Sequence, residues 1–211
     1  MFKKIRGFTL IELMISLIIM SLIILGIYNI ETFSNSQVID SDRRARVQND
    51  LTHILEHMSK NIQQANGTKF NPPIKLYPDS GAKTGFQVNF DCKSTPSNLG
   101  DDVWIYYTLN SITHELRVGC SGSNCGTGGL CSAVPPMVPG ELLSDNIVGN
   151  FSSGALPEPL VNGFSVNIDA LGNFVEIGLV GCYTTEPVGP RYVNPQVEMK
   201  TKVICNSSST N

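Results

Sequence analysis

The sequence predicts an α+β protein in which one long N-terminal helix, first hydrophobic and then amphipathic, packs on an antiparallel β-sheet domain. Three observations predict this. The long apolar run Phe8–Ile30 has Glu12 as its only charged side chain, a helical repeat follows it without a linker, and short strand-like segments fill the remainder. A chain of 211 residues can hold one ordinary domain plus an appendage. We expect four parts: a basic leader at 1–7, a hydrophobic helix at 8–30, its amphipathic continuation at 31–66 and a disulfide-stapled β-rich domain at 67–211.

The apolar run is long enough to cross a membrane. At ~1.5 Å per residue, Phe8–Ile30 spans about 34 Å. The charges that precede it are Lys3, Lys4 and Arg6, so the positive-inside tendency leaves the N-terminus in the cytoplasm. A secretory signal has a shorter apolar core and a small-residue cleavage site, and neither is present.

Glu12 is unexplained if the run is only an anchor. A carboxylate at that depth costs about 2.5–3.5 kcal/mol, so it needs a partner. If the chain is cut after Gly7, the new amino group of Phe8 on a neighbouring subunit can supply one. Glu12 is then a candidate residue for subunit assembly.

The segment Lys3–Leu13, with the sequence KKIRGFTLIEL, resembles the class III signal of type IV pilins and type II secretion pseudopilins. The resemblance implies that a prepilin peptidase cuts between Gly7 and Phe8 and methylates Phe8, and that Glu12 is the family's glutamate at the fifth mature position. It implies a pilin-like fold, with other pilins, minor pilins and an inner-membrane assembly platform as partners. The precursor would cross the bacterial inner membrane once, with a periplasmic C-terminal domain. One departure is Asn29, where many major pilins have a proline.

The closing segments Val175–Leu179 and Val197–Val203 resemble those of W-type minor pilins and J-type pseudopilins. The helix segment Gln48–Met58 also matches that group. This resemblance implies a minor pilin that takes part in type IV pilus assembly at the initiating tip. Two alternatives stay open. One is a pseudopilin of a type II secretion system, and the other is a tip module for adhesion or DNA uptake.

The second half of the helix carries one apolar stripe. Residues 31–42 are its softest part, and Asn66-Gly67 supplies the stop. His53 and His57 lie four residues apart, and we favour a packed or solvated pair over a metal site. The residues of the stripe recur at steps of three or four: Val47, Leu51, Ile54, Leu55, Met58, Ile62 and Ala65.

The domain begins with a loop at 67–85, marked by prolines and glycines. Alternating residues then predict a meander, with a hairpin turn at Asn110-Ser111. The segment Glu141–Phe151 reads as a short helix or an edge strand. The expected strands are 86–90, 103–109, 112–118, 160–169, 173–182 and 196–205.

Six cysteines, an even number, indicate disulfides in an oxidising compartment. The segment Gly119–Gly140 reads as a stapled loop. In a symmetric final hairpin Cys182 and Cys205 are too far apart to bridge, so Cys205 would pair with the loop. The spacing of the loop cysteines does not fit zinc. The disulfide candidates are Cys92, Cys120, Cys125, Cys131, Cys182 and Cys205.

No catalytic, cofactor or metal motif emerges, so we expect a structural subunit and not an enzyme. Asp101-Asp102 lacks the alternating ligand spacing of a calcium loop, and we assign it to a turn. The glycines of the stapled loop lack the pattern of a phosphate-binding loop. The net charge of −3 leaves no electrostatic footprint for nucleic acid, although a small local patch stays open.

Overall fold

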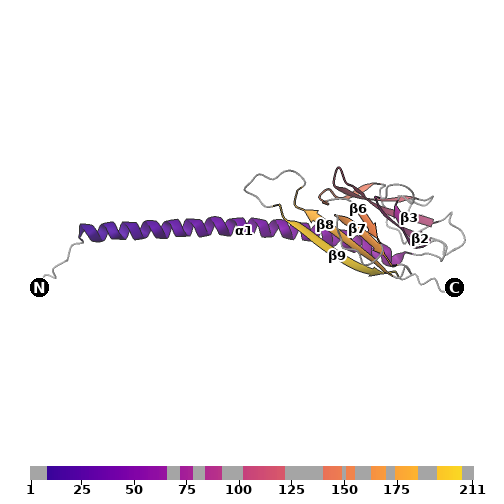
Figure 1. Ribbon diagram of the computed structural model, residues 1–211, viewed down its shortest axis with the longest axis horizontal. Coiled ribbons are helices and arrows are strands. Elements are labelled where there is room, and N and C mark those ends of the chain that lie inside the picture. The colour runs from indigo at the N-terminus through magenta and orange to yellow at the C-terminus, as the bar shows by residue number, and fades with distance from the viewer. Residues whose placement is uncertain are drawn as a thin grey trace. The chain divides into compact units, whose positions relative to one another are not determined.

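The computed structural model describes residues 9–65, 72–77, 84–91, 102–121, 140–148, 151–154, 163–169, 174–184 and 194–205. Within these ranges the chain forms one helix followed by nine strands (Figure 1). The predicted α+β class is confirmed. The chain divides into two compact units, 1–42 and 43–211, and the helix α1 (Leu10–Gln64) contributes to both.

The part of α1 in the first unit is a continuous helix whose side chains are almost all exposed. Gly26 and Asn29 lie inside it without a break, in keeping with the absence of a proline. Residues 31–42, expected to be the softest stretch, are helical as well. Hydroxyl groups within the apolar run bond to the preceding turn: Ser16 donates to the Glu12 carbonyl and Ser21 to the Leu17 carbonyl. These bonds leave the helix surface apolar.

The first sheet of the second unit is antiparallel, with strand order β1-β2-β3-β4-β5. Two of its strands refine the predictions. The segment expected to be a loop contains the short strand β1, and β5 shows that the edge-strand alternative was correct. The bounds are β1 (Ile74–Tyr77), β2 (Gly85–Asp91), β3 (Asp102–Asn110), β4 (Glu115–Ser121) and β5 (Glu141–Ser144).

The second sheet has the order β6-β7-β8-β9. The pairs β7–β8 and β8–β9 are antiparallel, whereas β6 runs parallel to β7, a pairing that the sequence did not predict. In the β8–β9 hairpin Cys182 pairs with Gln196, one residue from the expected symmetric register. The bounds are β6 (Phe151–Gly154), β7 (Phe164–Ile168), β8 (Phe174–Cys182) and β9 (Gln196–Ile204).

One hydrophobic core joins the second part of α1 to both sheets. The predicted stripe of α1 is buried throughout, from Val47 to Ala65. Phe86 of the first sheet lies 6.0 Å from Phe164 of the second, between ring centroids. Gly181 of β8 lets the helix approach, because a Cβ there would lie 3.1 Å from Leu51 Cδ2. The sheets and the helix therefore form one packed unit.

The turn between β3 and β4 differs from the prediction. It spans residues 111–114, so Ile112 belongs to the turn and not to a strand. Asn110 Oδ1 accepts bonds from the backbone nitrogens of Ile112 and Thr113, at 3.0 and 3.3 Å. His114 closes the turn with φ 59°, in the left-handed region. An asparagine side chain that bonds two backbone amides can hold a longer turn than the Asn-Ser pair suggested.

Candidate assembly site

Glu12 lies at the beginning of α1, where it caps its own helix. Its Oε2 accepts bonds from the backbone nitrogen and from Oγ1 of Thr9, both at 2.9 Å. In return the Glu12 nitrogen donates to Thr9 Oγ1, at 3.4 Å. This reciprocal arrangement is a capping box, which satisfies amides that the first turn leaves without partners.

This capping role was not predicted, although the sequence carries its signal. Thr9 and Glu12 have the T-x-x-E spacing that starts many helices. Both bonds from Thr9 go to Oε2. Because an ionised carboxylate has about four acceptor positions, capping leaves capacity for a further donor. The two roles of Glu12, helix cap and partner of a neighbouring amino group, are therefore compatible.

The other predicted processing residues lie outside the described ranges. They are the leader charges Lys3, Lys4 and Arg6 and the cleavage pair Gly7 and Phe8. Cleavage after Gly7 and methylation of Phe8 stay predictions.

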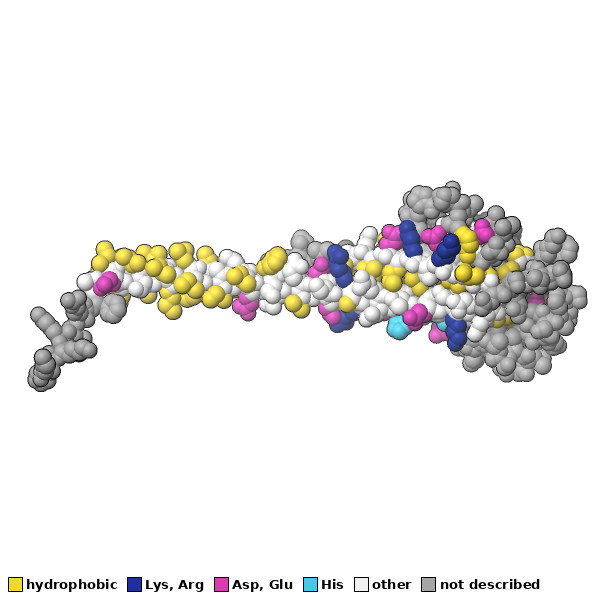
Figure 2. Space-filling model, turned by 90° about the horizontal axis from the view of Figure 1, so that it is seen from below, with side chains coloured by type: hydrophobic (Ala, Val, Ile, Leu, Met, Phe, Trp, Pro, Cys, Tyr) yellow, Lys and Arg dark blue, Asp and Glu magenta, His cyan; other side chains and the backbone are white. Residues whose placement is uncertain are grey.

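The first part of α1 presents an apolar surface to its surroundings. Large hydrophobic side chains from Leu10 to Ile39 are between 44% and 80% exposed. Figure 2 shows many of them along the helix on the face in view. Among the described residues, α1 is the one helix long and apolar enough to cross a membrane. A helix that is apolar on all sides requires lipid or other helices around it.

The second part of α1 is fastened to the first sheet by a polar contact within the core. Asn61 Nδ2 donates to Tyr107 Oη, and that oxygen lies 3.0 Å from His57 Nδ1. Burial raises the pKa of the Tyr107 hydroxyl, and the bond from Asn61 opposes this. Burial also lowers the pKa of His57. The Nδ1 of a neutral His57 can accept a hydrogen bond from the Tyr107 hydroxyl, which itself accepts one from Asn61.

His53, the other member of the predicted histidine pair, is exposed, whereas His57 is half-buried against Tyr107. Within the described ranges no three His, Cys, Asp or Glu side chains are grouped to hold a metal ion.

The cysteines divide into two groups. Cys120 is disulfide-bonded, whereas Cys182 and Cys205 are free thiols, so the disulfide prediction is wrong for these two. They lie at opposite ends of the β8–β9 hairpin, about 30 Å apart at ~3.3 Å per residue, whereas a bridge needs Cα atoms about 4.4–6.8 Å apart. Burial raises the pKa of both thiols, which keeps them neutral. Cys92, Cys125 and Cys131 lie outside the described residues.

The predicted turn at Asp101-Asp102 is partly corrected. Asp102 is the first residue of β3, is buried and accepts a bond from Asn89 Nδ2 at 3.0 Å. Asp101, like most of the predicted stapled loop, lies outside the described residues.

A comparison with protein families finds one match, in which residues 2–28 match the prokaryotic N-terminal methylation motif. No curated protein and no solved structure matches the chain. The matched segment holds the predicted cleavage pair and Glu12, and it ends inside the apolar part of α1. The motif and this helix fit a precursor anchored in the inner membrane. Together, the methylation motif at residues 2–28 and the long apolar N-terminal helix fit the type IV pilin family, in which we include the pseudopilins.

Proposed function

We propose that this chain is a minor pilin, a structural subunit that prepilin peptidase processes and that takes part in type IV pilus assembly at the initiating tip. The observation that carries the proposal is the first part of α1. From Leu10 to Ile30 it exposes large apolar side chains along its length and carries one acidic group, Glu12, near its start. Lipid can cover this surface in the precursor, and the helices of other subunits can cover it in a fibre.

Glu12 would set the axial position of one subunit against the next. In this proposal its carboxylate pairs with the amino group of Phe8 on a neighbour, while Thr9 keeps its bonds to Oε2. A charge buried alone is strongly destabilising, so a subunit that is out of register should be rejected. The partners are other pilins and minor pilins, prepilin peptidase and the inner-membrane assembly platform. The domain formed by both sheets would be periplasmic in the precursor.

Two experiments test the processing step and the kind of fibre. For processing, we expect Gly7→Val to retain residues 1–7 and to be absent from fibres. Mass spectrometry of the N-terminal peptide should show methylated Phe8 in the wild type, and Arg6→Lys, which keeps the leader charge, should behave like the wild type. A mature-sized Gly7→Val product would contradict the cleavage assignment.

The kind of fibre is tested in a strain from which the gene for this chain has been deleted. Counting surface pili and measuring exported proteins in the deletion strain separates the candidates. Loss of pili with normal export supports the minor pilin. Loss of export with normal pili would replace it with a pseudopilin of a type II secretion system. Intact pili with lost attachment or DNA uptake would favour a tip-binding module.

A further inference from the structure

The side of the first sheet that faces away from the core carries a row of aromatic rings. Strand alternation places Tyr77 of β1 and Trp104 and Tyr106 of β3 on this side, which we call the aromatic face. All three are half-buried. Their strand neighbours Leu76, Ile105 and Tyr107 point to the opposite side, where Ile105 and Tyr107 are completely buried. The aromatic face is therefore not part of the hydrophobic core.

The rings on this face are ordered by contacts with one another. Tyr77 stacks on Tyr106 with centroids 5.0 Å apart and planes 12° from parallel. Lys75 Nζ lies 4.7 Å from the centroid of Trp104. Gly119 faces Tyr106 on the next strand, and a Cβ there would collide with the tyrosine ring. A glycine at 119 thus lets the Tyr106 ring occupy the surface of β4, where it stacks with Tyr77, and Trp104 lies two residues away on the same side of β3.

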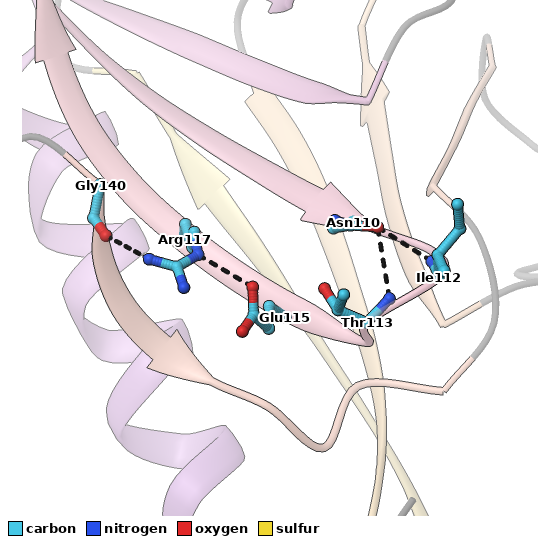
Figure 3. Close-up of polar contacts among 6 residues, drawn as sticks. All are labelled: Asn110, Ile112, Thr113, Glu115, Arg117 and Gly140. Atoms are coloured by element: carbon cyan, nitrogen blue, oxygen red, sulfur yellow. Dashed lines mark hydrogen bonds and ion pairs between the residues drawn. The ribbon is translucent and has the colours of Figure 1, made fainter.

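A pocket of about 420 Å³ adjoins the Tyr77 end of the aromatic face, within the size range of small-ligand sites. Residues of the β3–β4 turn line part of it, and the tip of this turn carries the 87% exposed Ile112. Bonds from the Ile112 and Thr113 amides to Asn110 hold this turn in place (Figure 3). The lining residues are uncharged: Thr84, Thr108, Asn110 and Ser111 with polar side chains, and Tyr77, Leu109 and Ile112.

Two cations among the described residues on this side of the sheet, Arg117 and Lys75, are already engaged. Arg117 donates from Nε to Glu115 Oε2 at 3.0 Å and from Nη1 to the Gly140 carbonyl at 2.7 Å (Figure 3). Lys75 lies over Trp104. A platform for single-stranded nucleic acid combines aromatic rings with a positively charged groove for the phosphates. The described residues of this surface place rings beside hydroxyl and amide groups and form no such groove, an arrangement that suits an uncharged ligand with both C–H and O–H groups.

We propose that the aromatic face and its pocket bind a neutral oligosaccharide. Sugar C–H groups would pack on the electron-rich faces of Tyr77, Tyr106 and Trp104. Sugar hydroxyls would exchange hydrogen bonds with Thr84, Thr108 and Ser111 in the pocket. The proposal does not depend on the role in fibre assembly, because it uses neither Glu12 nor the apolar part of α1.

The test uses the full-length chain in lauryldimethylamine oxide micelles, a detergent without a sugar headgroup. Trp104 is the one tryptophan of the sequence, so its fluorescence reports on the aromatic face directly. The probes are cellohexaose, maltohexaose and chitohexaose, each titrated to about 5 mM. We expect at least one to change the fluorescence saturably. Tyr77→Ala should weaken that binding about tenfold, and Thr108→Val about three- to tenfold through the lost hydroxyl.

Matched substitutions elsewhere serve as controls. Tyr28→Ala on α1 is the control for Tyr77→Ala, and Thr201→Val, at a half-buried threonine of β9, is the control for Thr108→Val. Neither control substitution should alter the sugar titration. The proposal would be overturned if the wild type binds none of the three probes. It would also be overturned if Tyr77→Ala and Thr108→Val both bind the sugar as tightly as the wild type. Tighter binding of a (dT)16 oligonucleotide, or loss of fibres in Thr108→Val with the sugar titration unchanged, would overturn it in favour of a nucleic-acid or subunit contact.

Discussion

Met20 and Met58 lie on the same helix, yet Met20 is 60% exposed and Met58 is completely buried. The contrast extends to the two parts of α1. From Leu10 to Ile30 the large apolar side chains are all more than half exposed, whereas from Val47 to Ile62 a single stripe is buried against the protein's own sheets. The second part has its partner within the chain. The first part exposes its apolar side chains, and under the proposed function lipid or the helices of other subunits cover them. This difference would then separate folding of the domain from assembly of the fibre.

The largest expected effect comes from truncating the same residue type in each part. We expect Met58→Ala to lower the free energy of unfolding of the domain by about 2–5 kcal/mol, because it leaves a cavity in the core. Met20→Ala should change it by less than about 0.5 kcal/mol. Urea unfolding of the full chain, followed by Trp104 fluorescence, measures both. Equal losses in the two variants would contradict the division of α1 into an assembly part and a domain part.

A second pair of substitutions tests the packing of the helix on β8. A side chain at Gly181 meets Leu51 at 3.1 Å and Val47 at 3.2 Å, whereas Gly26 has nothing within 4 Å. We expect Gly181→Val to cost about 1–3 kcal/mol through overpacking. Gly26→Val should cost nothing, because valine forms helix better than glycine. The same unfolding assay applies, and an unaffected Gly181→Val would show that the helix does not pack this closely.

The smallest effect is the pH dependence contributed by His57. Burial lowers its pKa in the folded chain below the ordinary value of about 6.5, with Lys60 acting in the same direction and Glu141 opposing. The unfolded chain therefore binds the proton more readily. The contribution of His57 is complete above pH ~6.5 and is lost as the pH falls through the folded pKa.

Unfolding measured from pH 8 to pH 5 should show this loss in the wild type and in His53→Gln, whose side chain is exposed. His57→Gln should lack it. If the difference in unfolding free energy between wild type and His57→Gln does not change with pH, the Tyr107–His57 contact does not depend on a neutral histidine.

The helix and strands whose apolar residues recur at a regular spacing were predictable from the sequence. The stripe of α1 follows the helical repeat, and β3, β8 and β9 follow alternation within about one residue at each end. The short strand β1 was not, because Pro72-Pro73 and Pro78 read as a loop. Those prolines flank an edge strand of four residues instead of interrupting it. The parallel strand β6 was also missed, since its pairing with β7 depends on contacts that no local pattern encodes.

The candidate site was predictable where a motif carries it. Gly7, Phe8 and Glu12 were assigned from the sequence and lie within the match at residues 2–28, while their roles in processing and assembly stay predictions. The capping box was not predicted, although the spacing of Thr9 and Glu12 is the T-x-x-E pattern of such a box. The free state of Cys182 and Cys205 depends on where the hairpin ends, and an even number of cysteines does not determine that. The contact among Asn61, Tyr107 and His57 joins distant segments and has no sequence signature.

The most direct test separates the two roles of Glu12. Glu12→Gln keeps an oxygen that can accept both bonds from Thr9, since glutamine also forms capping boxes, but it removes the charge. Thr9→Val does the reverse, weakening the cap by about 1 kcal/mol and keeping the carboxylate.

The measurement is the amount of each full-length variant recovered in sheared surface fibres, relative to the amount in the membrane. We predict that Glu12→Gln is processed at its leader and is then lost from fibres, while Thr9→Val enters them nearly as well as the wild type. Normal incorporation of Glu12→Gln, with Thr9→Val excluded, would show that Glu12 serves only its own helix and would contradict the assembly role.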